Sequence, residues 1–362
     1  MNRAMRTLLR RAGTALLFLV IALCLAPSVA MPLLDRVYHR GAPSDHFDGA
    51  RFFNPLAAPV PGQGSPARFI NRWLKGDNRA GWPDRVPVTP SRPPARVAGG
   101  RMLVTWIGHA SVLVQADGLN ILTDPVWSER ASPILFAGPK RVRAPGVRFE
   151  DLPRIDLVLI SHNHYDHLDL PTLKRLWARD RPKIVTSLGN ETILRAAGIE
   201  AVAGDWRGVV PVTAETRVEI LRNHHWSSRW GADRNRALWS AFRVDLPGGA
   251  LFFAGDTGWG DGRWVEEAAA RGGYRLAIIP IGAYAPRDFM KNNHIDPAEA
   301  VAIFERLRPT RALGIHWGTF QLTFEPIDEP RQRLEALKRA HKIAEDAFVA
   351  TEVGRTIEVP RM

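Results

Sequence analysis

SHNHYDHLD, at residues 161–169, places three histidines and two aspartates directly after an apolar run. The run predicts a buried strand, and imidazole and carboxylate groups crowded at its end are costly to bury without a partner. An extended backbone directs His162 and His164 to the same side, while Asp166 and His167 follow where the chain turns. Two divalent metal ions would use all four side chains, and this mixture of donors suits zinc, or iron and manganese. A histidine-rich surface loop is the alternative interpretation.

Four further apolar runs end in a candidate ligand in the same way. The residues that follow them are His109, the pair His224 and His225, Asp256, and His316. Strand ends are held by a rigid scaffold, which a preorganised metal centre needs. These segments argue against a surface loop at 161–169, because they supply the ligands that this motif lacks. His109 has two interpretations: it orients a metal ligand, or it caps the turn at Gly108.

The chain has 362 residues, of which 45% are hydrophobic and 12 are tryptophan, so it can bury a sizeable core in one large domain or two ordinary ones. Strand-like and helix-like segments alternate within 101–362. They predict an α/β domain with two sheets packed face to face and covered by helices. Asp169 is the expected N-cap of one helix, and 296–299 has a capping-box pattern. Residues 31–100, rich in Pro and Gly, predict an irregular extension wrapped over this domain.

The first 30 residues have the layout of an export signal. Four arginines precede the apolar run at 15–26, and small residues follow as far as Ala30. Twelve apolar residues are few for a membrane span, so we expect a cleaved signal peptide, with an uncleaved N-terminal anchor as the alternative. Both interpretations place the protein in the cell envelope, either periplasmic or anchored in the inner membrane. The only cysteine, Cys24, lies in this leader, so the metal ligands must be His and Asp.

The chain is basic, with a formal net charge of +12. Removing residues 1–30 takes away four arginines and no acid, so the remainder carries +8. A basic surface can meet nucleic acid or anionic lipid. The arginines are scattered, and no basic helix or repeat interleaved with aromatic residues suggests a nucleic-acid module. We therefore expect lipid head groups and the membrane surface as partners, and no nucleic acid.

Longer segments, from about residue 100 to 325, resemble one protein family. They are WIGHASVLV at 106–114, LTDPVWSERASP at 122–133, GPKRVR at 138–143, SHNHYDHLD at 161–169, HHW at 224–226, GDTGW at 255–259, PIGAYAPRDFMKNNHIDPAEA at 280–300 and IHWGTF at 315–320. These segments are similar to the N-acylphosphatidylethanolamine-hydrolysing phospholipase D branch of the metallo-β-lactamase superfamily. The resemblance implies an αββα sandwich of two mixed sheets flanked by helices. It also implies a dinuclear metal centre, for which zinc is the expected metal.

The resemblance assigns a role to each candidate residue. One ion would be bound by His162, His164 and His225, the other by Asp166, His167 and His316, and Asp256 would bridge both. The family usually has Gln where this chain has His224, and the spacing to Trp226 favours His225 as the ligand. The expected catalytic residues are Asp166, Asp256 and His294, the last of which matches a family histidine near the substrate cleft. From their positions near these ligands, Tyr284, Trp226, Trp259 and Trp317 are expected to contact substrate. The alternative is that the tryptophans are core residues and that Tyr284 lies in a solvated loop.

The implied reaction is hydrolysis of N-acylphosphatidylethanolamine, or a related phospholipid, to an N-acylethanolamine and phosphatidate. A hydroxide held by the two metals would attack phosphorus in line. Asp166 would orient the hydroxide, and His294 would donate a hydrogen bond to the phosphate or to the leaving oxygen. A homodimer is a further partner that the resemblance suggests, because eukaryotic members of the family are often dimeric.

The sequence is compatible with three other functions. The chain can be a lactonase or another ester hydrolase of the same superfamily, which a panel of lactones and diesters would distinguish. It can be a membrane-associated metal-binding or lipid-binding protein without turnover, but a binding protein has no need for a complete centre open to water. Nucleic-acid processing, which other branches of the superfamily perform, is disfavoured by the export leader.

Overall fold

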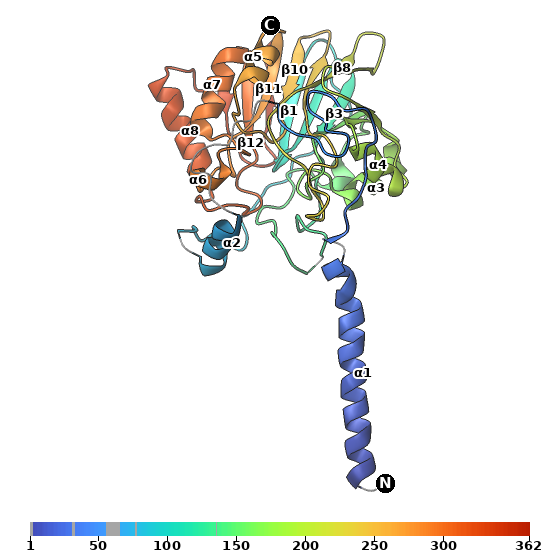
Figure 1. Cartoon of the computed structure of the whole chain (residues 1–362). Helices are drawn as coiled ribbons and strands as arrows, with labels where there is room; N and C mark the ends of the chain where they lie inside the picture. The colour runs from blue at the N-terminus through green and yellow to red at the C-terminus, as the bar shows by residue number, and fades with distance from the viewer. Residues whose placement is uncertain (1–2, 31–32, 56–65, 77, 135) are drawn as a thin grey trace.

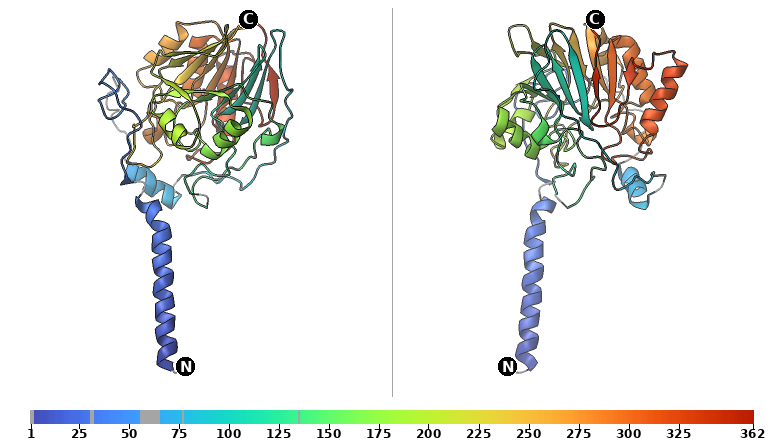
Figure 2. Two further views of the ribbon diagram at one scale, coloured as in Figure 1. Left: turned by 90° about the vertical axis from the view of Figure 1, so that its right-hand side faces the viewer. Right: turned by 180° about the vertical axis from the view of Figure 1, so that it is seen from behind.

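Two β-sheets pack face to face at the centre of the molecule, and helices cover their outer faces (Figures 1 and 2). The computed structural model describes residues 3–30, 33–55, 66–76, 78–134 and 136–362. Each sheet has seven strands and combines parallel with antiparallel pairs. This architecture confirms the predicted αββα sandwich.

The first sheet joins the early strands of the domain to the last strand of the chain. In spatial order it contains β14 (Thr356–Glu358), β1 (Met102–Gly108), β2 (Ser111–Ala116), β3 (Leu119–Thr123), β4 (Leu157–Ile160), β5 (Lys183–Ser187) and β6 (Val202–Gly204). In β4, Leu157 and Leu159 pack in the core between the sheets, while Val158 and Ile160 pack toward the helices. Both faces of this strand are therefore buried, which explains why its sequence is apolar throughout.

The second sheet holds the strands of the C-terminal half. In spatial order it contains β13 (Phe348–Val349), β12 (Arg311–Ile315), β11 (Tyr274–Pro280), β10 (Ala250–Phe253), β9 (Ala241–Asp245), β8 (Arg217–Leu221) and β7 (Val209–Pro211). Its outer face is covered by α5 (Arg263–Ala269), α7 (Pro297–Leu307) and α8 (Glu329–Ala340). The outer face of the first sheet is covered by α3 (Leu170–Asp180) and α4 (Asn190–Ala196). The connection between β3 and β4 carries a 3-10 turn at Phe149–Asp151, and the connection between β11 and α7 carries α6 (Arg287–Met290).

Two helix starts were predicted from capping residues. The capping box of α7 is confirmed, because the Asp296 carboxylate accepts hydrogen bonds from two backbone N–H groups of the first turn. Asp169 is confirmed as the N-cap residue of α3, but its side chain makes no capping hydrogen bond to the first turn. Its carboxylate accepts instead from the backbone N–H groups of Trp127 and Ser128, at 3.2 and 3.0 Å. Asp169 therefore fixes the loop that follows β3 against the start of α3.

The N-terminal helix α1 (Arg3–Ala30) projects away from the lower end of the domain (Figure 1). Within it, Met5–Ala26 is 22 residues long with a mean hydropathy of 2.0, and none of that window is buried. An apolar helix of this length fits an export signal and a membrane anchor alike.

The segment between α1 and β1 is only partly irregular. Phe47 and Phe52 are buried against Leu238 and Trp239, so this part of the chain packs onto the domain. The prediction of irregular chain throughout is wrong for Pro66–Lys75, which forms helix α2. The helix starts with proline at its first position, where the missing N–H does not matter.

Candidate metal centre

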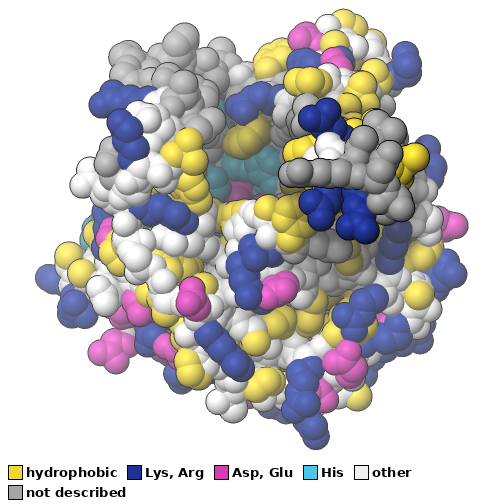
Figure 3. Space-filling view, turned by 90° about the horizontal axis from the view of Figure 1, so that it is seen from below, with side chains coloured by type: hydrophobic (Ala, Val, Ile, Leu, Met, Phe, Trp, Pro, Cys, Tyr) yellow, Lys and Arg dark blue, Asp and Glu magenta, His cyan; other side chains and the backbone are white. Residues whose placement is uncertain are grey.

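The candidate ligands follow strands that end at the same edge of the sandwich. In the first sheet β1, β3 and β4 run in one direction, and in the second sheet so do β8, β10 and β12. The carboxyl ends of each set therefore meet, which brings the residues that follow them together. Figure 3, which views the molecule from below, shows histidine side chains at the floor of a hollow. The hollow opens on the side from which α1 leaves the domain.

Three imidazoles form the first part of the centre, which we call the histidine group. It consists of His162 and His164 after β4 and His225 after β8. The Nε2 atom of His162 lies 2.8 Å from Nδ1 of His164. The Ser161 hydroxyl is 2.9 Å from Nδ1 of His162, and Nδ1 of His225 donates to the Asn293 carbonyl at 2.9 Å. These outer contacts orient the rings so that Nε2 of His162 and of His225 is left for a metal.

The second part of the centre, which we call the carboxylate group, consists of Asp166, His167 and His316. The Nε2 atoms of the two histidines are 3.2 Å apart, and Oδ2 of Asp166 lies 3.4 and 3.5 Å from them. Asp124 accepts from Nδ1 of His167 at 2.7 Å and so fixes that ring. Nε2 of His109 lies 2.9 Å from Oδ2 of Asp166. Of the two interpretations of His109, the structure therefore fits the one in which it orients a ligand.

Asp256 follows β10 and lies between the two groups. Its Oδ2 atom is 3.1 Å from Nε2 of both His167 and His316, and 4.0 Å from Nε2 of His225. The position fits the predicted bridging role. Gly255 permits it, because a Cβ atom there would lie 2.7 Å from Cβ of Ser161 and would separate the two strand ends.

The residues present fit two divalent metal ions. Ring nitrogens face one another at 2.8 Å in the histidine group and at 3.2 Å in the carboxylate group. Several buried acceptor atoms also have no hydrogen-bond partner, among them Nε2 of His225 and Oδ1 of Asp256. Buried lone pairs that face one another with no hydrogen-bond donor between them cost free energy unless a cation binds them. These buried clusters therefore form a candidate dinuclear metal site.

The electrostatics of the two groups differ. Burial lowers the pKa of His164 to about 3, and it holds the pKa values of His162 and His225 well below the usual histidine value. These imidazoles are therefore neutral, as metal binding requires. Burial also acts to lower the pKa of His316, but the charge of Asp256 and the hydrogen bond to Asp166 outweigh it and raise the pKa to about 9. Without metal, protons thus take the place of a cation in the carboxylate group.

Three residues of the centre have left-handed backbone conformations. The φ angles are 52° at His109, 30° at Asp124 and 64° at His316. Asp and His adopt this region more readily than most residues, but it remains a strained one that costs on the order of 1–3 kcal/mol. The strain lies where strands give way to ligand-bearing turns, and it fits a site whose geometry is imposed by the surrounding fold.

The structure separates the two neighbouring histidines after β8. His225 is buried in the histidine group, whereas the half-buried His224 ring packs against Gly260. His225 is therefore the residue placed to bind metal. His294 also reaches the centre, with its Nδ1 atom 3.8 Å from Oδ2 of Asp256 and its ring 5.2 Å from that of His225. Burial lowers the pKa of His294 to about 4, so its ring is neutral.

Of the four residues predicted to contact substrate, one lies beside the metal ligands. The Trp226 ring is 4.2 Å from that of His164. Trp317 is buried and stacks on Trp106 at 5.1 Å, and the Trp259 ring lies under the guanidinium of Arg306 in α7. The Tyr284 hydroxyl donates to Glu329 of α8 at 2.6 Å. The contacts of these last three side chains are therefore with the core and the helices.

Sequence reasoning missed the residues that orient the ligands, chiefly Asp124, Ser161 and Asn293. Asp124 is fully buried and accepts from the Ser161 hydroxyl at 2.6 Å as well as from His167. The signal for Asp124 was present, because it follows β3 as the ligands follow their strands. The role of Asn293 belongs to a backbone carbonyl, which no sequence pattern marks.

A cavity of about 980 Å³ adjoins the ligand motif. It is lined mainly by apolar side chains, including Tyr165 from within that motif, Trp230, Leu170, Ile134 and Ile193. The guanidinium of Arg229 lies 3.9 Å from the Tyr165 ring and donates to the carbonyls of 163 and 168, so the wall nearest the centre is fixed. Such a space suits an apolar chain.

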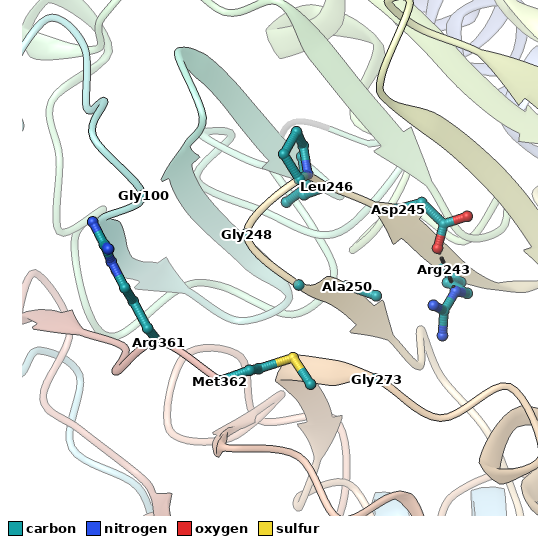
Figure 4. A pocket seen from close by; sticks show the side chains of 11 residues that line it. Gly100, Arg243, Asp245, Leu246, Gly248, Ala250, Gly273, Arg361 and Met362 are labelled. Atoms are coloured by element: carbon teal, nitrogen blue, oxygen red, sulfur yellow. Dashed lines mark hydrogen bonds and ion pairs between the residues drawn. The ribbon is translucent and has the colours of Figure 1, made fainter.

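A second hollow, of about 670 Å³, lies at the opposite end of the domain, near the C-terminus (Figures 1 and 4). Its walls include Gly248, Gly249 and the terminal residues Arg361 and Met362, and its one acidic side chain, Asp245, accepts from Arg243 at 2.6 Å. Among the lining residues that the structure describes, none is a histidine. This hollow offers no metal-binding chemistry.

Comparisons with known proteins agree with this centre. Residues 119–317 match the family described as Beta-lactamase superfamily domain. The chain is 38% identical over 269 residues to N-acyl-phosphatidylethanolamine-hydrolyzing phospholipase D 1 of Caenorhabditis elegans, which covers 71% of this chain and 76% of that protein. It is 33% identical over 258 residues to the mitochondrial N-acyl-phosphatidylethanolamine-hydrolyzing phospholipase D of Saccharomyces cerevisiae, which covers 70% of this chain and 55% of that protein.

Solved structures support the fold. The crystal structure of a possible metal-dependent hydrolase from Veillonella parvula superposes with a TM-score of 0.58 at 15% identity, over 71% of this chain and 99% of that one. With the buried histidine and aspartate clusters, these similarities identify a metal-dependent hydrolase. The chain belongs to the metallo-β-lactamase superfamily and, within it, to the family of N-acylphosphatidylethanolamine-hydrolysing phospholipase D proteins.

Proposed function

We propose that this hydrolase cleaves the phosphodiester bond of N-acylphosphatidylethanolamine, or of a closely related N-acylated phospholipid, to give an N-acylethanolamine and phosphatidate. The observation that carries the proposal is the 38% identity to a protein named for this reaction. The centre supports it, because two divalent ions held there would activate water and stabilise negative charge on a phosphoryl group. We also propose zinc as the metal, since nitrogen and carboxylate donors suit it.

The protein's own side chains would orient the attacking water and donate a hydrogen bond to the phosphoryl group or to the leaving oxygen. Oδ2 of Asp166 is held by His109 at 2.9 Å, so the carboxylate is positioned to accept a hydrogen bond from water. His294 is neutral, since burial lowers its pKa to about 4, and its Nδ1 atom has no hydrogen-bond partner. Its ring N–H would donate to a phosphoryl oxygen or to the leaving oxygen.

The surroundings of the centre suit a lipid. Trp226, packed on His164, gives the centre an apolar wall. The cavity beside Tyr165 and Trp230 has room for an acyl chain, and we assign the N-acyl chain of the substrate to it. A substrate with a water-soluble head alone would leave this apolar surface exposed.

The direct test is hydrolysis of N-acylphosphatidylethanolamine in mixed micelles by the full chain, with the products identified by mass. We expect release of N-acylethanolamine and phosphatidate, loss of the reaction on chelation, and recovery when Zn²⁺ is restored. His162→Ala should abolish turnover and lower the metal content. His224→Gln is the matched control and should retain both, because His224 lies outside the two groups.

Two results would contradict the proposal. A folded, metal-loaded protein that leaves the lipid intact but hydrolyses a lactone or a carboxylic ester would assign it to another reaction of the superfamily. Full activity in His162→Ala would show that the centre is not where the reaction occurs.

A further inference from the structure

A segment close to the N-terminus packs on the loop that carries one of the metal ligands. It comprises residues 33–55, which come after α1, and we call it the strap. The loop comprises residues 222–240, between β8 and β9, and we call it the ligand loop because it contains His225. Two residues that line the large cavity, Arg229 and Trp230, belong to the same loop. Contacts that fix the ligand loop therefore fix both a metal ligand and a wall of that cavity.

The strap is bound to the ligand loop by apolar and by backbone contacts. Phe47 and Phe52 of the strap are buried against Leu238 and Trp239 of the loop. The Phe52 N–H also donates to the Asn235 carbonyl at 2.8 Å. The apolar contacts hold the two segments together, and the directional hydrogen bond sets how they lie on each other.

A buried carboxylate links the strap to the part of the loop that lines the cavity. The Tyr38 hydroxyl of the strap donates to Asp233, which is fully buried, at 2.8 Å. Asp233 in turn accepts from the backbone N–H groups of Arg229 and Trp230, at 3.1 and 2.9 Å. The strap thus contacts the ligand loop at both ends of the loop's irregular stretch.

Asn54 joins the strap directly to the metal ligand. Its side-chain amide donates to the His225 carbonyl at 2.8 Å, although 171 positions separate the two residues in sequence. Its side-chain oxygen accepts from the Trp239 indole at 3.2 Å. The nitrogen and the oxygen of the amide therefore each have a partner of the matching kind, which fixes the orientation of the Asn54 side chain.

The bond from Asn54 completes the contacts that fix His225. On the ring, Nδ1 donates to the Asn293 carbonyl at 2.9 Å, and Nε2 is left for the metal. On the backbone, the carbonyl accepts from Asn54. The first bond sets the tautomer and the direction of the ring, and the second sets the position of the backbone that carries it. A metal ligand has to be held within about 0.5 Å of its productive position, so both bonds matter.

We propose that Asn54 is a positioning residue of the metal centre, which holds the His225 carbonyl and thereby keeps Nε2 of that ring where the ion of the histidine group binds. The strap is then part of the metal centre, although it lies outside residues 119–317, which match the superfamily domain. The proposal concerns the binding of metal and holds for whichever bond the centre cleaves.

The test is Asn54→Asp in the full chain. The aspartate keeps the shape of the side chain and the acceptor for Trp239, but it places an oxygen instead of an N–H against the His225 carbonyl. The two oxygens repel each other, so the backbone of His225 should shift. We expect the affinity for the ion of the histidine group to fall by about tenfold, while the affinity for the other ion changes little. Competition with a chelator of known affinity measures both.

Cobalt gives a second measurement, which a general loss of stability would not change. With Co²⁺ as the only metal supplied, the visible absorption that His225→Gln removes belongs to the histidine group. Asn54→Asp should shift this absorption and leave the remainder unchanged. Asn54→Ala, which removes the donor and the acceptor together, should shift the same absorption.

His46→Gln is the matched control within the strap. The His46 ring lies between the carboxylates of Asp45 and Asp205, at 2.6 and 2.7 Å, and stacks on Trp206 at 4.4 Å. These partners lie outside the ligand loop. We therefore expect this variant to lower the melting temperature of the protein but to leave the metal affinity and the Co²⁺ absorption unchanged.

Two results would overturn the proposal. The first is an unchanged metal affinity and Co²⁺ absorption in Asn54→Asp. The second is an equal change in Asn54→Asp and His46→Gln, because general loosening of the strap, and not the bond to His225, would then govern the binding of metal.

These measurements do not depend on turnover. A protein that responds to Asn54→Asp as expected but leaves N-acylphosphatidylethanolamine intact would refute the proposed reaction alone. A protein that cleaves this lipid, and whose Asn54→Asp variant binds metal as before, would refute the positioning role alone.

Discussion

The histidine group and the carboxylate group share Asp256 but are held in place by different means. In the histidine group the outer contacts are neutral, from the Ser161 hydroxyl and the Asn293 carbonyl. In the carboxylate group they are charged, because Asp124 holds His167 at 2.7 Å. The structure thus places lone pairs on one side of the centre and most of its negative charge on the other.

This difference predicts unequal binding of the two ions. A cation in the carboxylate group is attracted by Asp166, Asp256 and the buried Asp124, whereas one in the histidine group is attracted by Asp256 and by neutral nitrogens. We therefore expect a chelator at neutral pH to remove the ion of the histidine group first.

The largest expected effect comes from the residue that the two groups share. Asp256→Asn keeps the shape of the side chain but removes its charge, so both ions should be lost. Turnover should fall by more than about a thousandfold, which exceeds the loss expected when one hydrogen-bond donor to the transition state is removed. Metal analysis of the purified variant, together with its rate, measures both. The control is Asp261→Asn, an exposed residue a few positions along the same loop, which should retain both ions. Retention of two ions by Asp256→Asn would refute the bridging position.

A matched pair tests the histidine group by itself. His225→Gln should lose one ion and most activity, since Nε2 of His225 is a buried acceptor with no other partner. His224→Gln should keep both ions, because that ring packs against Gly260 outside the group. Metal stoichiometry after gel filtration distinguishes the two variants. If His224→Gln loses the ion and His225→Gln keeps it, the assignment of these neighbours is reversed.

The outer contacts should differ in strength between the groups. Asp124→Asn replaces an acceptor with a donor facing Nδ1 of His167, and we expect metal affinity to fall by about 10–100-fold. Ser161→Ala removes a neutral contact of His162, worth on the order of 1 kcal/mol, so the loss should be about tenfold or less. Competition with a chelator of known affinity gives both values. A larger effect of Ser161→Ala would contradict the charge difference between the groups.

The sequence was most informative where the site is local. The ligands from His162 to His167 span six residues just after one strand, so their number and spacing already indicated two ions. The sandwich followed from apolar runs such as that of β4, whose two buried faces leave no room for polar residues. Asp124 was missed although it follows β3 as the ligands follow their strands.

Proximity to a ligand in the sequence was a poor guide to side-chain direction. Trp317 follows His316 directly, yet its ring stacks on Trp106 in the core between the sheets. Trp259 lies three residues after Asp256 but packs beneath α7. The choice between His224 and His225 likewise depends on which ring the turn after β8 directs inward. Helix α2 was not predicted because the contacts that fix it, to Phe324 and Asp288, are remote in sequence.

The smallest expected effect is on the stability of the metal-free protein, where the two groups should respond to pH with opposite signs. The pKa of His164 is lowered to about 3 by burial, against 6.5 for an ordinary histidine. Below pH 6.5 the unfolded chain binds a proton that the folded protein does not, so stability falls as the pH falls. The pKa of His316 is raised to about 9. Its contribution is complete below pH 6.5 and is lost as the pH rises toward 9.

Melting temperatures of the chelator-treated protein, measured across this pH range, test both effects. We call the fall in stability below pH 6.5 the acid limb and the fall toward pH 9 the alkaline limb. His316→Gln should flatten the alkaline limb and His164→Gln the acid limb, and each variant serves as the control for the other. Restoring metal should remove the alkaline limb in the unchanged protein, because an ion then supplies the positive charge that protons supply in its absence. Burial acts to lower the pKa of His167, but the charges of Asp256 and Asp166 outweigh it and raise that pKa as well, so part of the alkaline limb should remain in His316→Gln. A limb that is unchanged in His316→Gln would show that His316 does not hold the extra proton.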